Sequence, residues 1–211
     1  MEIYDISQTL REGIAVWPGD PEFRHRWITR MQDGESSNVS AVEMGVHTGT
    51  HVDAPLHLDD SGGNIAGTPI HHFLGPTRVF SISSRESIGE ADLESLDWKG
   101  VERVLFKTRL AGLPNQPFEK SYVYLEESAA EFLIKQGILL VGIDAPSVDA
   151  FESKNLPSHR ILLRHGIVIL EGAMLDSVPD GDYELVCLPL KLAGLDGSPV
   201  RAVLIGQKPN Y

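Results

Sequence analysis

The segment His47-Thr-Gly-Thr-His51-Val-Asp53-Ala-Pro-Leu-His57 decides how the rest of the chain must fold. It holds three of the protein's eight histidines, together with one carboxylate. The odd-numbered positions carry these four side chains, while the even-numbered positions are mostly apolar. An extended chain with this period-2 pattern places the four side chains on one face. Imidazole and carboxylate are ligands of Zn²⁺ and Mn²⁺, so the segment predicts a metal site.

A straight strand cannot bring these side chains to one ion. At about 3.3 Å per residue, His47 and His51 would lie roughly 13 Å apart, whereas each must approach the ion to about 2 Å. The backbone therefore has to bend, and Gly49 is free to take unusual dihedral angles. Pro55 limits further strand pairing, and the Gly, Thr and Val content disfavours a helix. We predict a bent strand-to-loop segment around a metal; ordinary core or surface histidines are the alternative.

Length and composition favour one domain over residues 1–211, with 42% hydrophobic residues. The net charge of −12 and the lack of a Lys/Arg run argue against nucleic acid and anionic membranes as partners. The single cysteine, Cys187, lies in an apolar stretch and is expected to be a core residue rather than a nucleophile. No signal peptide or long apolar run is visible, so a cytoplasmic protein is expected.

The pattern along the chain predicts a strand-rich, mixed α/β fold. A helix that ends at Gly137 leads directly into a strand that is apolar on both faces, which indicates that helices cover part of the sheet. The expected strands cover residues 3–6, 23–31, 38–47, 77–83, 101–108, 138–143, 167–170, 183–190 and 200–205. The expected helices cover residues 69–73, 90–96, 127–136 and 159–164, the last with Ser158 as its N-cap.

Further ligands have to come from the second half of the chain. Glu171 directly follows an apolar strand, where a carboxylate is costly unless it is paired, metal-bound or solvated. His159 and His165 flank a short helix; we favour His159 as the ligand and His165 as a C-terminal cap. The adjacent His71 and His72 are expected to be structural or surface residues. Trp17 either packs against the core or stands over a ligand pocket, and its spacing alone favours packing.

The segment from His47 to His57 resembles the signature of the metal-dependent cyclase family. The flanking sequence is similar, nearly end to end, to the aryl-formamidase branch of that family. The stretches that carry this similarity are 17–20, Gly75-Pro76, 141–147, Ser153-Lys154, His159, 169–172, 181–185 and 188–191. Two places depart from the branch: Ala145 stands where threonine is common, and Pro157-Ser158 fall in a variable segment. Both are expected near the pocket, so they bear on substrate identity rather than on metal binding.

The resemblance implies a swivelling β/β/α fold and a centre of two divalent metal ions. Zn²⁺ is favoured, with Mn²⁺ or Co²⁺ as alternatives. It implies the following roles: His47, His51 and Asp53 hold one ion, Asp53 and Glu171 bridge to a second that His159 completes, His57 is the acid/base, and Trp17 contacts substrate. It also implies a homo-oligomer, either a dimer or a tetramer.

The implied activity is hydrolysis of the formamide of N-formyl-L-kynurenine to L-kynurenine and formate. Histidine titrates near neutral pH, so His57 is suited to take a proton from water and return it to the leaving nitrogen. One alternative is a family hydrolase of another cyclic or linear amide or lactone, such as isatin. A non-catalytic metal-binding protein is a second. A serine hydrolase is disfavoured because the chain has no Gly-x-Ser-x-Gly motif.

Overall fold

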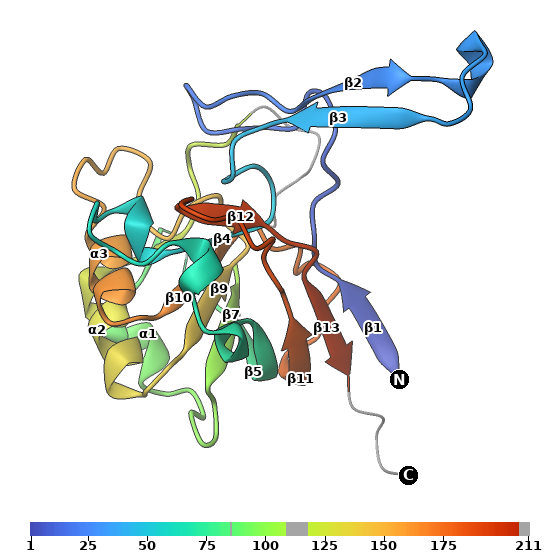
Figure 1. Cartoon of the computed structure of the whole chain (residues 1–211). Coiled ribbons are helices and arrows are strands. Elements are labelled where there is room, and N and C mark those ends of the chain that lie inside the picture. Colours follow the sequence, from blue (N-terminus) through green and yellow to red (C-terminus); the bar gives the residue numbers. More distant parts are fainter. Residues whose placement is uncertain (85, 109–117, 207–211) are drawn as a thin grey trace.

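One large mixed β-sheet organises the structure, a computed structural model that describes residues 1–84, 86–108 and 118–206. Among these residues, nine strands form the sheet in the order β1-β13-β11-β5-β7-β9-β10-β4-β12 (Figure 1). Their bounds are β1 Glu2–Asp5, β4 His51–Asp53, β5 Leu74–Ser81, β7 Arg103–Lys107, β9 Leu140–Ile143, β10 Val168–Glu171, β11 Gly181–Val186, β12 Gly197–Pro199 and β13 Val203–Gly206.

The middle of the sheet is parallel and buried on both sides. Strands β5, β7, β9 and β10 pair in parallel, while the strands toward both edges pair antiparallel. Val104 and Val141 belong to one apolar core, and the neighbouring Leu105 and Leu140 belong to another. Successive strand residues point to opposite faces, so the two cores lie on opposite faces of the sheet. This explains why these strands are continuously apolar in sequence.

Three α-helices of the described chain lie together on one side of the sheet (Figure 1): α1 Glu90–Leu93, α2 Glu127–Lys135 and α3 Pro157–Arg164. Helix α2 buries Ala129, Phe132 and Leu133 in the first core. It ends at Gly137, whose φ of 72° allows the Ile138 amide to donate back to the Leu133 carbonyl. None of the helices in the described ranges is long and apolar enough to cross a membrane.

Smaller elements surround this body. Strands β2 (Arg24–Thr29) and β3 (Val39–Glu43) form an antiparallel hairpin that projects away from the sheet (Figure 1). Strands β6 (Ser87–Ile88) and β8 (Tyr124–Leu125) form a short parallel pair. Single 3₁₀ turns occur at η1 Met31–Asp33, η2 Pro55–His57, η3 Ile65–Gly67 and η4 Ile70–Phe73.

The mixed, strand-rich α/β prediction is confirmed, and each expected strand is present with shifted ends. The expected helix at 69–73 is a 3₁₀ turn instead. Ser158 is not an N-cap, which is a second error. Helix α3 begins at Pro157, the preferred residue for a first helical position, and Ser158 lies inside it. The Ser158 hydroxyl donates to the Leu125 carbonyl, which ties the helix to β8.

Gly142 in β9 provides a test of the packing between the central strands. A Cβ atom at this position would overlap Leu105 Cδ2 and lie 3.3 Å from Leu170 Cδ2, and both leucines are fully buried. We expect Gly142→Ala to lower the free energy of unfolding by about 1–3 kcal/mol, because buried neighbours have little room to move. Denaturant unfolding measures the change. Gly63→Ala is the matched control, since a Cβ there meets nothing within 4 Å. Equal stability of the two variants would contradict this packing.

Candidate metal centre

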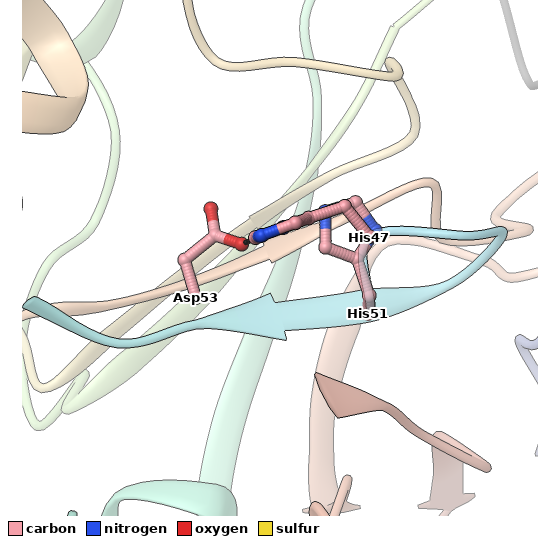
Figure 2. A group of neighbouring side chains, drawn as sticks. All are labelled: His47, His51 and Asp53. Carbon is pink, nitrogen blue, oxygen red and sulfur yellow. Dashed lines mark hydrogen bonds and ion pairs between the residues drawn. The ribbon is translucent and has the colours of Figure 1, made fainter. Parts of the chain in front are cut away.

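The backbone bends sharply between His47 and His51. Gly49 has a φ of 70°, a left-handed conformation that favours glycine, and a Cβ there would lie 2.8 Å from Leu10 Cδ2. The turn brings the His47 and His51 ring centroids to 5.0 Å from each other, far closer than a straight strand allows (Figure 2). The bend predicted at Gly49 is therefore confirmed.

His47, His51 and Asp53 form one cluster of candidate ligands, and Figure 2 shows their side chains converging above strand β4. His47 Nδ1 lies 2.9 Å and His51 Nε2 lies 3.5 Å from Asp53 Oδ1. The other nitrogen of His51, Nδ1, lies 2.9 Å from the Gly49 carbonyl and so donates to it. That bond places the proton on Nδ1 and leaves the Nε2 lone pair facing the cluster.

Asp53, His159 and Glu171 form a second, fully buried cluster that shares Asp53 with the first. Strands β4 and β10 pair antiparallel with His51 opposite Glu171, which places Glu171 Oε2 3.3 Å from His51 Nε2. His159, on the first turns of α3, lies with Nε2 3.0 Å from Glu171 Oε1 and 3.5 Å from Asp53 Oδ2. The fold thus brings together all five residues that the resemblance implied as ligands.

Asp149, which the sequence reasoning missed, holds His159 in place. One carboxylate oxygen accepts the His159 Nδ1 proton at 2.7 Å and the His159 amide at 3.0 Å, and the other accepts the Ser158 amide at 3.0 Å. These bonds satisfy amides at the start of α3 and fix the proton of His159 on Nδ1. The Nε2 lone pair then faces Asp53 and Glu171. A carboxylate behind a histidine is a recurrent support of metal-binding histidines.

The electrostatics of the cluster favour ionised carboxylates. Burial would raise the pKa of Asp53, but His159 and His47 hold it well below its ordinary value. Burial likewise opposes ionisation of Glu171, yet His159 lowers its pKa to about 2 despite the nearby charge of Asp53. The pKa of His159 is raised well above its ordinary value, because Glu171 and Asp149 outweigh the effect of burial. Two buried carboxylates therefore require positive charge between them.

Asp53 Oδ2 provides a separate indication that a cation fits here. This atom is buried and, within the described residues, accepts no hydrogen bond. Its ion-pair partner, His159 Nε2, lies 3.5 Å away. A buried carboxylate oxygen without a hydrogen bond is costly unless a cation compensates it. The donor set of imidazole and carboxylate around it suits divalent transition metals. The residues present therefore fit metal ions at the two adjoining clusters.

His57 lies beside these clusters and forms a hydrogen bond with Asp196, a second residue that sequence reasoning missed. Its Nδ1 is 3.1 Å from Asp196 Oδ2, and the same oxygen lies 2.8 Å from His47 Nε2. The His57 ring centroid is 4.3 Å from that of His47 and 5.8 Å from that of His159. His57 therefore faces the metal clusters from the cavity side, next to both histidines.

A cavity of about 580 Å³ opens over the clusters, and His47, His51, His57, His159 and Glu171 line its floor. Trp17 lines the same cavity and packs against Phe118 and Phe151, with ring centroids 5.2 and 5.0 Å away. Trp17 thus both packs and forms a pocket wall. Trp17 and Phe118 both line the cavity and give it an aromatic wall.

Other predicted residues lie outside the centre. His165 ends α3 and bonds the Ile161 carbonyl through Nδ1, in agreement with a capping role. His72 lies 3.3 Å from the Leu139 carbonyl, and its ring contacts that of His71. Cys187 is buried, and burial raises the pKa of its thiol to about 12, which excludes a thiolate nucleophile near neutral pH.

Removing the charge of Asp149 tests the support of His159. We expect Asp149→Asn to weaken metal binding by about 10–100-fold, because an amide cannot accept from all three N–H groups without bringing its own NH₂ toward one of them. Competition with a chromophoric chelator measures the affinity. Asp92→Asn is the control, since Asp92 accepts the Gly89 amide at the start of α1, away from the centre. Unchanged affinity in Asp149→Asn would contradict the supporting role.

Comparison with known proteins places this centre in a family. The family model described as "Putative cyclase" matches residues 4–150 of the chain. A kynurenine formamidase of Bacillus thuringiensis subsp. konkukian (strain 97-27) is 46% identical over 203 residues, covering 96% of this chain and 97% of that protein.

Solved structures agree with this placement. A protein described as a potential metal-dependent hydrolase with cyclase activity is 32% identical, with a TM-score of 0.84 and coverage of 99% of both chains. An isatin hydrolase bound to the product analogue thioisatinate shares the fold, with a TM-score of 0.85 at 22% identity over 98% of this chain and 93% of that chain. The chain belongs to the cyclase family and, within it, groups with the kynurenine formamidases.

Proposed function

We propose that this chain is a metal-dependent arylformamidase that hydrolyses N-formyl-L-kynurenine to L-kynurenine and formate. The observation that carries the proposal is the pair of ligand clusters joined at Asp53, which lie on the floor of a cavity with an aromatic wall. The relation to kynurenine formamidases supports the same substrate. A second candidate is hydrolysis of a cyclic amide such as isatin, which the shared fold with an isatin hydrolase suggests.

The centre is proposed to hold two divalent ions in each chain. His47, His51 and Asp53 would hold one ion, and Asp53, Glu171 and His159 would hold the other. Zn²⁺ suits the imidazole-rich set, and Mn²⁺ or Co²⁺ are alternatives. When bound, such ions supply Lewis acidity that polarises a carbonyl oxygen and acidifies water.

The cavity suits an aromatic amino acid derivative. Trp17 and its aromatic neighbours offer a face for the aryl ring of the substrate. Among the described residues that line the cavity, Lys154 is the only lysine or arginine. It is the available counter-charge for the α-carboxylate that distinguishes N-formylkynurenine from a simple formanilide. The formamide group would then lie against the ligand clusters at the floor of the cavity.

His57 is the proposed acid/base. Hydrolysis adds water to the formyl carbon and breaks the C–N bond, so one proton must leave the water and one must reach the departing aniline nitrogen. Histidine can perform both transfers because it changes protonation near neutral pH. His57 lines the cavity beside the clusters, bonded to Asp196 rather than to Asp53 or Glu171. This placement suits a proton carrier that is not a ligand.

The substrate assignment is tested by comparing N-formyl-L-kynurenine with N-phenylformamide, isatin and a simple lactone. We expect the highest kcat/KM for N-formylkynurenine, because that substrate uses both the aromatic wall and Lys154. A chelator should abolish activity, and added Zn²⁺ should restore it. Faster turnover of isatin or the lactone would transfer the assignment to the alternative substrate. No hydrolysis by protein with its metal bound would reject the enzyme assignment.

Paired variants separate the roles of the two neighbouring histidines. We expect His57→Ala to retain its metal ions and to lose about 10²–10⁴-fold in kcat, the usual contribution of a general acid/base. His51→Ala should lose both activity and bound metal, because His51 belongs to the first cluster. Metal analysis of the purified variants, together with kinetics, distinguishes the two. A metal-depleted His57→Ala protein would show that His57 is a ligand.

A further inference from the structure

Asp196 bonds two histidines of the site with one oxygen. Its Oδ2 atom lies 2.8 Å from His47 Nε2 and 3.1 Å from His57 Nδ1. A carboxylate only accepts hydrogen bonds when ionised, so each of these ring nitrogens carries the donated proton. Asp196 therefore fixes which nitrogen is protonated on both rings. His47 belongs to the first ligand cluster, and His57 does not.

For His47, this bond directs the ring toward the metal cluster. Its Nε2–H donates to Asp196, and its Nδ1 lies 2.9 Å from Asp53 Oδ1. Nδ1 is therefore the nitrogen that the ring presents to the cluster. The Asp196 carboxylate stands behind His47 in the same way that Asp149 stands behind His159.

For His57, the same oxygen selects one of two tautomers. Nδ1–H donates to Asp196, and within the described residues Nε2 has no hydrogen-bond partner. A neutral imidazole with its proton on Nδ1 has its lone pair on Nε2. The ring can then accept a proton at Nε2, and the carboxylate at Nδ1 stabilises the imidazolium that results.

The loop that carries Asp196 is fixed by backbone contacts. The Asp196 carbonyl accepts the Ala54 amide at 2.8 Å, and the next residue, Gly197, pairs with Asp53 in the sheet. A Cβ atom on Gly197 would lie 2.8 Å from His47 Cε1, so glycine at this position lets the loop close against the His47 ring. Asp196 is therefore held next to the site by the pairing of β4 with the edge strand β12.

We propose that Asp196 is a positioning residue that orients His57 for proton transfer at Nε2 while it holds His47 toward the metal cluster. The role at His57 rests on the proposed function, in which His57 is the acid/base. The competing possibility is that His47, His57 and Asp196 are themselves ligands of a cation, since their ligand atoms lie within 4.8 Å of one another. A test has to separate orientation from metal binding.

A double-mutant cycle on the metal-loaded enzyme distinguishes orientation of His57 from metal binding by Asp196. In the native background, Asp196→Asn should lower kcat for N-formylkynurenine by about 10²-fold or more, because general acid–base catalysis contributes about 10²–10⁴-fold. KM and the number of metal ions bound at saturating metal concentration should stay unchanged, although the affinity for metal should fall as in Asp149→Asn. In a His57→Gln background, the same change should lower kcat less than about 3-fold, since a residue that acts through His57 has nothing left to orient.

Asp5→Asn is the matched control. Asp5 is a carboxylate of similar exposure, at 44% against 36% for Asp196, and it also accepts two side-chain N–H groups, both from Arg201. It lies on β1, away from the cavity. This variant should retain the native kcat and metal content.

Nitrogen-15 NMR of the histidine rings tests the same inference without catalysis. His57 should show the Nδ1–H tautomer in the native protein and a mixture of tautomers in Asp196→Asn. The Nε2–H tautomer in the native protein would overturn the inference. Loss of a metal ion from Asp196→Asn at saturating metal concentration, or an equal loss of kcat in both backgrounds, would overturn it as well. If native enzyme fails to cleave N-formylkynurenine, the proposed substrate is wrong, while the tautomer measurement still decides the role of Asp196.

Discussion

The fold depends on burying the Asp53 carboxylate, which has no exposed surface, next to a second buried carboxylate, Glu171. Their ligand atoms lie within 4.8 Å of each other. Like charges this close repel by roughly 3–4 kcal/mol at an effective dielectric constant near 20, and each also loses its hydration. Positive charge has to compensate both. Histidines 47, 51 and 159 surround the pair, and the bare Asp53 Oδ2 leaves a place for a cation.

The surrounding strands and helix hold the compensating groups in place against the electrostatic cost of burying two carboxylates. Rigid elements supply each group: β4 carries His51 and Asp53, β10 ends at Glu171, and α3 starts at the helical turn that holds His159. The antiparallel register of β4 and β10 sets His51 against Glu171 without any flexible segment. Asp149 accepts a hydrogen bond from the His159 ring, and Asp196 accepts one from the His47 ring. These two carboxylates fix the orientation of the rings. His57 and Trp17 line the cavity on the open side of the clusters.

Much of this could be predicted from the sequence, because the strongest signals are local. The period-2 pattern and Gly49 predicted the bent ligand segment. The position of Glu171 at the end of an apolar strand left a paired or metal-bound carboxylate and a solvated one as alternatives, and the structure buries it. The choice of His159 over His165 and the division of roles came chiefly from the family resemblance. Spacing alone could not decide between packing and pocket wall for Trp17, because its side chain packs against Phe118 and lines the cavity at the same time.

What could not be predicted depends on long-range pairing. Asp196 lies in a loop with no periodicity, and its partners His47 and His57 become neighbours only after the sheet has formed. Asp149 is nearer to its partners in sequence, but the irregular loop between them has no spacing that marks the contact. Strand β12 spans only Gly197–Pro199 and contains glycine and proline, so no strand pattern marks it. The Ser158 prediction failed because the Asp149 carboxylate, nine residues earlier, rather than the Ser158 hydroxyl, accepts from the amides at the start of α3.

The proposed metal centre has Asp53 as the ligand shared by two adjoining sites. Anomalous diffraction from crystals of the metal-loaded protein, recorded on both sides of the metal absorption edge, tests it most directly. The account predicts two anomalous peaks that flank the Asp53 carboxylate, one toward His47 and His51 and the other toward His159 and Glu171. A single peak, or peaks that Asp53 does not contact, would contradict it.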